Sequence, residues 1–136
     1  MLDPAQIPAV AVNEQLARFI LFSRHIRSSN QTVKPDAFIP HPHSELSMMR
    51  HLQATVRELW QEGHRVALLR KVPLHGRADV EVSCFVDQGL RVEPAPIPEN
   101  PNHVNALNWP AEKPDQKMKA LLISEKSRFV PLPHEL

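Results

Sequence analysis

The sequence predicts an α+β fold in which a small antiparallel sheet of about three strands packs against two or three helices. Three observations support this prediction. A capping box at 55–58 starts a helix, residues 79–86 alternate apolar and polar side chains as a half-buried strand does, and a turn at Gly89 precedes a second short strand. We expect a single domain over residues 1–136, with long proline-rich loops at 28–44 and 94–113 and an extended tail at 129–136.

Helices are predicted in three places. Asn13 is a suitable N-cap for a first helix that reaches about Arg27, with its apolar stripe built on residues such as Leu16 and Phe19. Thr55 and Glu58 have the spacing of a capping box. Gly63 is placed to end that second helix, and for 64–71 we favour more helix over a strand.

The last predicted helix begins at Pro114 with Asp115 in its first turn, which is a favourable helix start. Met118, Leu121 and Leu122 fall on one side of this helix and are expected to pack on the sheet. Strands are predicted at 46–50, 80–86 and 90–93. We expect the last two to form a hairpin through Gly89, with 46–50 beside 80–86.

Composition excludes several classes of protein. A single cysteine rules out an intramolecular disulfide, and the first 15 residues lack the basic start and apolar run of a signal peptide, so we expect a cytoplasmic protein with no membrane partner. Three isolated glycines cannot form a Walker loop or a dinucleotide-binding loop. The chain has no tyrosine, which argues against an RNA-recognition sheet. No cofactor is expected.

Charge is unevenly distributed although the net charge is only +1. Residues 24–77 carry nine Lys or Arg against four Asp or Glu, whereas residues 78–115 carry two against seven. Six of the eight histidines lie in the basic part. These two parts either complement each other as solvated faces of one fold, or form a surface that attracts an anion or an acidic partner.

Basic residues at two places are candidates for such a surface. Arg24, Arg27 and Lys34 could form a phosphate clamp, although charges at a helix C-terminus explain the first two equally well. Arg77 could act with Arg50 to hold a phosphate or carboxylate in bidentate fashion.

Candidate catalytic groups surround this predicted anion site. Asp79 could orient a histidine, with His75 or His103 as the general acid or base and Asn105 as an additional ligand-binding residue. The alternative is structural, because Arg77 and Asp79 lie two apart on an extended chain and can pair with each other.

His41 and His43 are weak candidates for metal ligands. In an extended chain, residues two apart point the same way, so these two histidines could converge on one ion with Glu45. A surface pair flanking Pro42 explains the spacing equally well.

The favoured function is a small cytoplasmic interaction or accessory module that binds an anionic ligand or an acidic partner through a His/Arg-rich surface. Its partner is then another protein in an assembly. The alternative is a small enzyme that acts on a phosphate-bearing substrate, such as a nucleotide or an RNA end, by histidine acid/base chemistry. The enzyme requires its basic and histidine side chains to converge on one concave pocket, whereas a module spreads them over an open surface.

Overall fold

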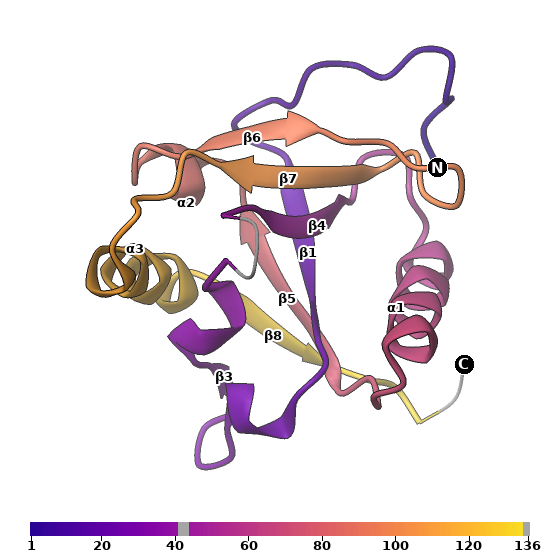
Figure 1. Cartoon of the computed structure of the whole chain (residues 1–136). Coiled ribbons are helices and arrows are strands. Elements are labelled where there is room, and N and C mark those ends of the chain that lie inside the picture. Colours follow the sequence, from indigo (N-terminus) through magenta and orange to yellow (C-terminus); the bar gives the residue numbers. More distant parts are fainter. Residues whose placement is uncertain (41–43, 135–136) are drawn as a thin grey trace.

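A computed structural model describes residues 1–40 and 44–134 and has α+β architecture with a large antiparallel sheet (Figure 1). The main sheet has six strands in the order β6-β7-β4-β1-β5-β8, and a second sheet has two, β2 and β3. The prediction of a small sheet of about three strands is therefore wrong. The strands are β1 Gln15–Ile20, β2 Ile26–Arg27, β3 Thr32–Val33, β4 Leu46–Arg50, β5 Gly76–Glu81, β6 Arg91–Pro94, β7 His103–Leu107 and β8 Arg128–Pro131.

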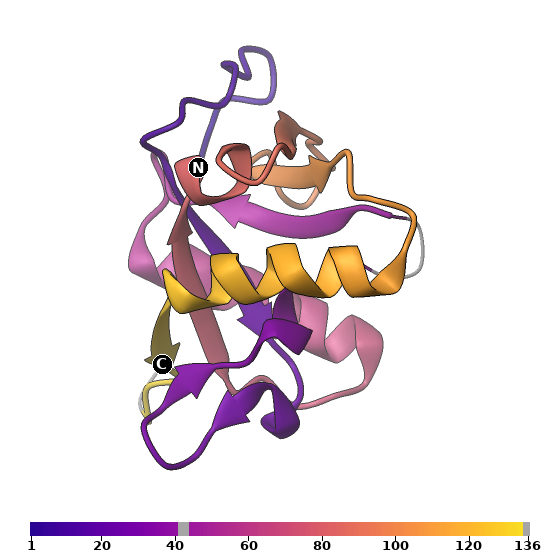
Figure 2. The ribbon, with the colours of Figure 1, turned by 90° about the vertical axis from the view of Figure 1, so that its left-hand side faces the viewer.

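Helices cover both faces of the main sheet (Figures 1 and 2). The helix α1 (Val56–Arg70) packs on one face, where Leu59 and Trp60 join two small apolar clusters. The other face carries α2 (Ser83–Val86), α3 (Lys113–Glu125) and the 3-10 helix η2 (Pro35–Phe38), which together build the largest core cluster. A further 3-10 helix, η1 (Ser23–His25), precedes β2. In the described residues, every helix is too short or too polar to cross a bilayer.

The first predicted helix, 13–27, is wrong because its central part is the strand β1. Leu16 and Ile20 contribute to the cluster on the α3 side, while Ala17 and Phe19 pack towards α1. A central strand with both faces covered has apolar residues at successive positions, and such a short run also fits a helical stripe. The apolar residues of this segment therefore fit a buried strand as well as a helix.

The predicted hairpin is also wrong. The strand β5 ends at Glu81, and the segment expected to continue it turns into α2. Leu90 donates its amide to the carbonyl of Phe85, and the following strand β6 pairs with β7, not with β5. The valine alternation was misleading because Val80 is a strand residue, whereas Val82 already has helical backbone angles at the start of α2.

The capping box at Thr55 is confirmed. The Thr55 hydroxyl accepts the amide of Glu58, and the Glu58 carboxylate accepts the amide of Thr55. The helix does not end at Gly63 but runs to Arg70 and is closed by Lys71 in a left-handed conformation, so the preference for helix over 64–71 is confirmed. Gly63 instead permits close packing, because a Cβ there would lie 2.9 Å from the Phe19 ring.

The last helix is confirmed, but its buried side differs from the predicted one. Ala120 and Ile123 are buried, whereas Met118 and Leu122 are exposed. The strand predicted at 46–50 is β4, but its neighbours are β1 and β7. Strands also form within the two segments expected as a loop and a tail: β7 lies within 94–113, and β8 begins at Arg128 and pairs with β5.

The two halves of the main sheet are joined by a short seam. β1 pairs with β5 along all six of its residues, but with β4 only at Leu16↔Arg50 and Ala17↔Met49. Beyond these pairs the strands separate, and Figure 1 shows β6, β7 and β4 crossing β1, β5 and β8 at a steep angle. This separation creates the cleft described next.

Candidate functional site

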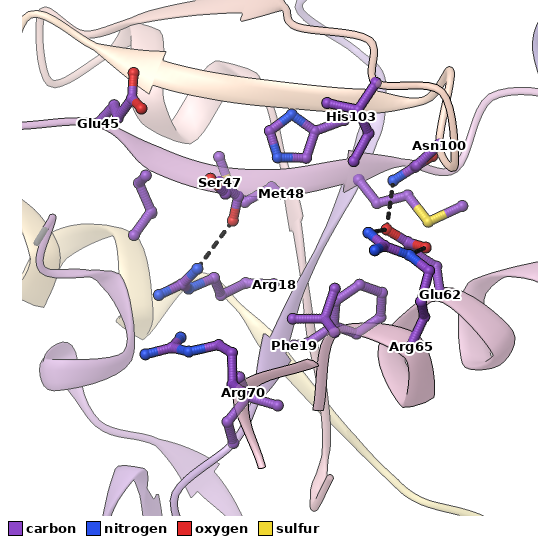
Figure 3. Close-up of a pocket in the computed structure, with 15 residues that line it drawn as sticks. Arg18, Phe19, Glu45, Ser47, Met48, Glu62, Arg65, Arg70, Asn100 and His103 are labelled. Carbon is purple, nitrogen blue, oxygen red and sulfur yellow. Dashed lines mark hydrogen bonds and ion pairs between the residues drawn. The ribbon is translucent and has the colours of Figure 1, made fainter. Parts of the chain in front are cut away.

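A cleft opens where β4 separates from β1, next to helix α1. We call it the sheet cleft (Figure 3). Its volume is about 250 Å³. Apolar side chains from β1, β4 and α1 line it, among them Phe19, Met48, Met49 and Val66. Polar and apolar groups share the lining about equally, and convergent polar groups beside an apolar wall can orient a small ligand.

Arg18 spans the open end of the seam. Its Nε donates to the carbonyl of Ala37 at 2.9 Å, and its Nη1 donates to the carbonyl of Ser47 at 2.9 Å. Burial of the guanidinium, together with the positive charge of Arg70, lowers the pKa of Arg18 to about 10. Arg18 therefore stays charged at neutral pH, in surroundings that oppose its charge.

Arg70, from the last turn of α1, lies at the same end of the cleft as Arg18 (Figure 3). Within residues 1–40 and 44–134, neither of these arginines forms an ion pair with a carboxylate. Glu45 also lines the cleft but is exposed. Among the described residues, this end of the cleft therefore carries two guanidinium charges that no ion pair neutralises.

The opposite end of the cleft is internally neutralised. Glu62 is buried and accepts two hydrogen bonds from Arg65, at 2.6 and 2.7 Å. The buried amide of Asn100 donates to the same carboxylate at 3.3 Å. A bidentate pair of this kind is a strong charge-assisted contact, so these three side chains form a fixed polar wall.

His103, on β7, places an imidazole on the cleft between these two ends (Figure 3). Its Nδ1 lies 2.9 Å from the carbonyl of Ala95. Because a carbonyl can only accept, Nδ1 carries the proton, and in the neutral ring Nε2 has a free lone pair. The ring is thus fixed in one tautomer, with Nε2 available to accept a proton.

A second depression, of about 590 Å³, contains the predicted pair Arg77 and Asp79; we call it the Asp79 pocket. Asp79 is buried and accepts from Arg77 Nε at 3.0 Å, while His51 Nε2 lies 2.9 Å from the same oxygen. Arg128 Nη2 lies 3.6 Å from the other oxygen. Burial opposes ionisation of Asp79, but the hydrogen bonds from His51 and Arg77 outweigh it and lower its pKa.

Arg77 is a buried part of this network. Its guanidinium stacks over Trp60, with Cζ 4.7 Å from the centroid of the ring. Its Nη1 is buried without a hydrogen-bond partner among the described residues. The stacking compensates in part for the missing partner. The arrangement matches the structural alternative, in which Arg77 pairs with Asp79.

Arg50 is fully buried and does not reach Arg77's pocket. Its guanidinium donates to both oxygens of Glu14 at 2.7 Å and to the carbonyls of Pro8 and Ala9. All three of its nitrogens donate inside the protein, and the side chain is fully buried, so Arg50 anchors the N-terminal segment against β4 and is not available to a ligand.

The other predicted residues lie elsewhere. His75 lines neither cavity, and its backbone joins Ile20 and Leu132. Arg24, Arg27 and Lys34 lie around the β2–β3 hairpin, where Arg24 stacks on Phe22 and Arg27 donates to the carbonyl of Val33. Of the predicted residues, His103 lines the sheet cleft, and Asn105 lies at its rim, bonded to Ser47 and Glu45.

The metal prediction falls outside the described structure, because His41 and His43 lie in the 41–43 gap. Within the described ranges, no three His, Cys, Asp or Glu side chains are grouped closely enough to hold a metal ion.

Sequence reasoning missed Arg18, Arg70 and Glu62. One signal for Arg18 was present, because a charge in the middle of the apolar run Leu16–Ile20 needs a polar partner if the run is a buried strand. The spacing of Glu62 and Arg65, three apart on a helix, indicated their pairing. Nothing local marked Arg70, which reaches the cleft only because α1 continues beyond Gly63.

Comparisons with protein-family models, with curated proteins and with solved structures found no match to this chain.

Proposed function

We propose that the protein is a binding module whose sheet cleft holds a small anionic group. The observation that supports this is the pair Arg18 and Arg70, two guanidiniums at one end of a cavity without a carboxylate partner in the described residues. Like charges held together cost free energy, and an anion bound between them removes that cost. Apolar side chains on the lining, such as Phe19 and Val66, reduce screening by water and so strengthen the attraction.

The proposal keeps the anion-binding function predicted from the sequence but moves it to other residues. Arg50 and Arg77 already have carboxylate partners, Glu14 and Asp79. A guanidinium that is neutralised inside the protein attracts an external anion only weakly, because the two carboxylates would compete. Arg18 and Arg70 form no ion pair in the described structure, and Glu45, the exposed carboxylate on the cleft lining, is paired with neither of them.

NMR titration tests the proposal. Sodium acetate and sodium phosphate would be added to ¹⁵N-labelled protein at constant ionic strength, with sodium chloride as the reference salt. The expected result is saturable shifts of the Arg18 Nε–H and of the amides of Phe19 and Ser47. In Arg70→Gln the affinity should fall about tenfold, the effect of losing one charge-assisted hydrogen bond.

Arg57→Gln is the matched control, because Arg57 is exposed on the same helix but lies outside the cleft lining. Its affinity should equal that of the unchanged protein. The proposal is wrong if neither anion shifts the cleft resonances, or if both variants weaken binding equally, which would indicate general attraction to a basic surface.

His103 supports a second candidate, the enzyme acting on a phosphate-bearing substrate. His103 lines the cleft that holds Arg18 and Arg70, and the Ala95 carbonyl fixes its tautomer with Nε2 as the basic nitrogen, which suits a general base. In this alternative His103→Asn abolishes hydrolysis of a chromogenic phosphate ester while phosphate still binds. If the unchanged protein does not hydrolyse such esters, the binding module is the better account.

A further inference from the structure

The cleft interrupts a β-ladder at a defined point. The amide of His51 donates to the carbonyl of Gln15 at 2.9 Å, so residues 15 and 51 form a hydrogen-bonded pair, and Ala17 with Met49 is the next pair of the same kind. Two residues further along each strand, Phe19 and Ser47 would form the next hydrogen-bonded pair, but the ladder does not include it. Their backbone groups face each other across the cleft.

The partners of the neighbouring strands confirm this direction. The amide of Val82 donates to the carbonyl of Glu14. Because hydrogen-bonded positions alternate along a strand, the backbone groups of the even-numbered residues of β1 bond to β5. The backbone amide of Arg50 donates to the carbonyl of Asn102, so the backbone groups of the even-numbered residues of β4 bond to β7. Phe19 and Ser47 therefore have their N–H and C=O groups on the sides that face the cleft.

Of these four backbone groups, the Ser47 carbonyl accepts a hydrogen bond from Arg18 Nη1. The β1–β4 ladder has already ended at Ala17↔Met49, so the amides of Phe19 and Ser47 and the carbonyl of Phe19 have no partner in that ladder. A ladder with a missing segment is completed by an extended peptide, which supplies alternating donors and acceptors.

The charges at the cleft end indicate which part of a peptide fits. Arg18 and Arg70 carry two positive charges and Glu45, which also lines the cleft, carries one negative charge, which leaves a net charge of +1. This matches the single charge of a carboxylate better than the double charge of a phosphate. Arg18 already uses its Nε–H and one Nη1–H on carbonyls, which leaves one N–H on Nη1 and two on Nη2 for a ligand.

The size of the cleft limits the length of the ligand. A volume of about 250 Å³ is slightly below that of typical drug-sized ligand sites, about 300 to 1,000 Å³. Only the last residue or two of a peptide would be enclosed. The side chain of the last residue would lie on the apolar lining formed by Phe19, Met48 and Val66.

We propose that the sheet cleft binds the carboxy-terminal end of another polypeptide in extended form, with the α-carboxylate between Arg18 and Arg70 and the peptide backbone on Phe19 and Ser47. This inference rests on the proposed anion-binding function and names its ligand. The partner is a protein or peptide with an accessible C-terminus that ends in an apolar residue.

Fluorescence anisotropy tests the inference with two matched probes. Both are fluorescein-labelled pentapeptides of mixed sequence ending in leucine, one with a free carboxylate and one with a carboxamide. The free acid should bind at least about tenfold more tightly than the amide, because the amide loses its charge-assisted contacts. Arg70→Gln should remove most of this difference, and Arg57→Gln should leave it unchanged.

Amide exchange gives an independent readout. The free-acid peptide should slow hydrogen exchange at Phe19 and Ser47, which form new backbone hydrogen bonds in the proposed complex. Equal binding of the acid and the amide would overturn the inference. So would a failure of both peptides in a protein whose cleft resonances still respond to acetate, a result that leaves the anion-binding function standing. If acetate, phosphate and both peptides all fail, both proposals are wrong.

Discussion

The sheet cleft and the Asp79 pocket both contain arginines, but among the described residues a carboxylate pairs with Arg77 of the pocket and none pairs with Arg18 or Arg70 of the cleft. In the Asp79 pocket, one buried carboxylate accepts from Arg77 and lies within ion-pair distance of His51 and Arg128. In the cleft, Arg18 is held by two neutral carbonyls and lies near Arg70. A buried neutralised cluster is costly to break, because removing one partner leaves an uncompensated charge, whereas an open pair of like charges repels and favours binding of an anion.

The largest effect should come from removing the carboxylate that holds the Asp79 pocket together. Asp79→Ala leaves buried Arg77 without its counter-charge and should lower the free energy of unfolding by about 3 to 5 kcal/mol. Urea unfolding measures this change. Glu93→Ala is the control, because Glu93 pairs with Arg91 on the exposed surface and should change stability by less than about 1 kcal/mol. Equal losses in the two variants would contradict the assigned role of Asp79.

Acid should weaken the same pocket. The pKa of Asp79 is lowered in the folded protein, so its ionised form contributes stability that is present above the ordinary value near 4 and is lost as the pH falls through the lower folded value. Asp79→Asn should therefore make stability less dependent on pH below about pH 4. Glu14 has a lowered pKa for a related reason: hydrogen bonds from Arg50 and Ala11 outweigh its burial. Some pH dependence should thus remain, and an unchanged slope in Asp79→Asn would contradict the prediction.

The smallest change in stability should come from a substitution in the cleft, and it should be neutral or stabilising, unlike the loss expected for Asp79→Ala. Arg70→Gln removes a like charge beside Arg18 and should leave stability unchanged or raise it by a few tenths of a kcal/mol, roughly the size of exposed charge repulsion. Thermal unfolding at low ionic strength measures it. A loss above about 1 kcal/mol would mean that Arg70 supports the fold and would remove the contrast between the two regions.

The sequence predicted elements best where local contacts determine them. The start of α1 follows from two hydrogen bonds between Thr55 and Glu58, and the start of α3 follows from Pro114 and Asp115 near its first turn. The strand β1 was misjudged because its packing partners, α1 and η2, are distant in the sequence and cover it on both faces. Periodicity cannot show coverage by distant elements.

The candidate site was predicted only in part, for a related reason. His103 was selected as a titratable residue near other polar groups, but its role depends on Ala95 and on the position of β7 beside β4. Arg18 and Arg70 meet across a separation of 52 residues, through a gap in the sheet that no local pattern indicates. The pairing of Arg77 with Asp79 could be predicted because residues two apart on a strand point to the same face and lie close together.

The seam between β1 and β4 has one fastened end and one open end. At the fastened end, buried Arg50 ties β4 to Glu14 and to the backbone of Pro8 and Ala9. At the open end, Arg18 links the strands through its hydrogen bond to the Ser47 carbonyl. Any widening of the cleft would then be a pivot about the last paired residues, Ala17 and Met49, so the entrance would move most while the buried cores on either side keep their packing.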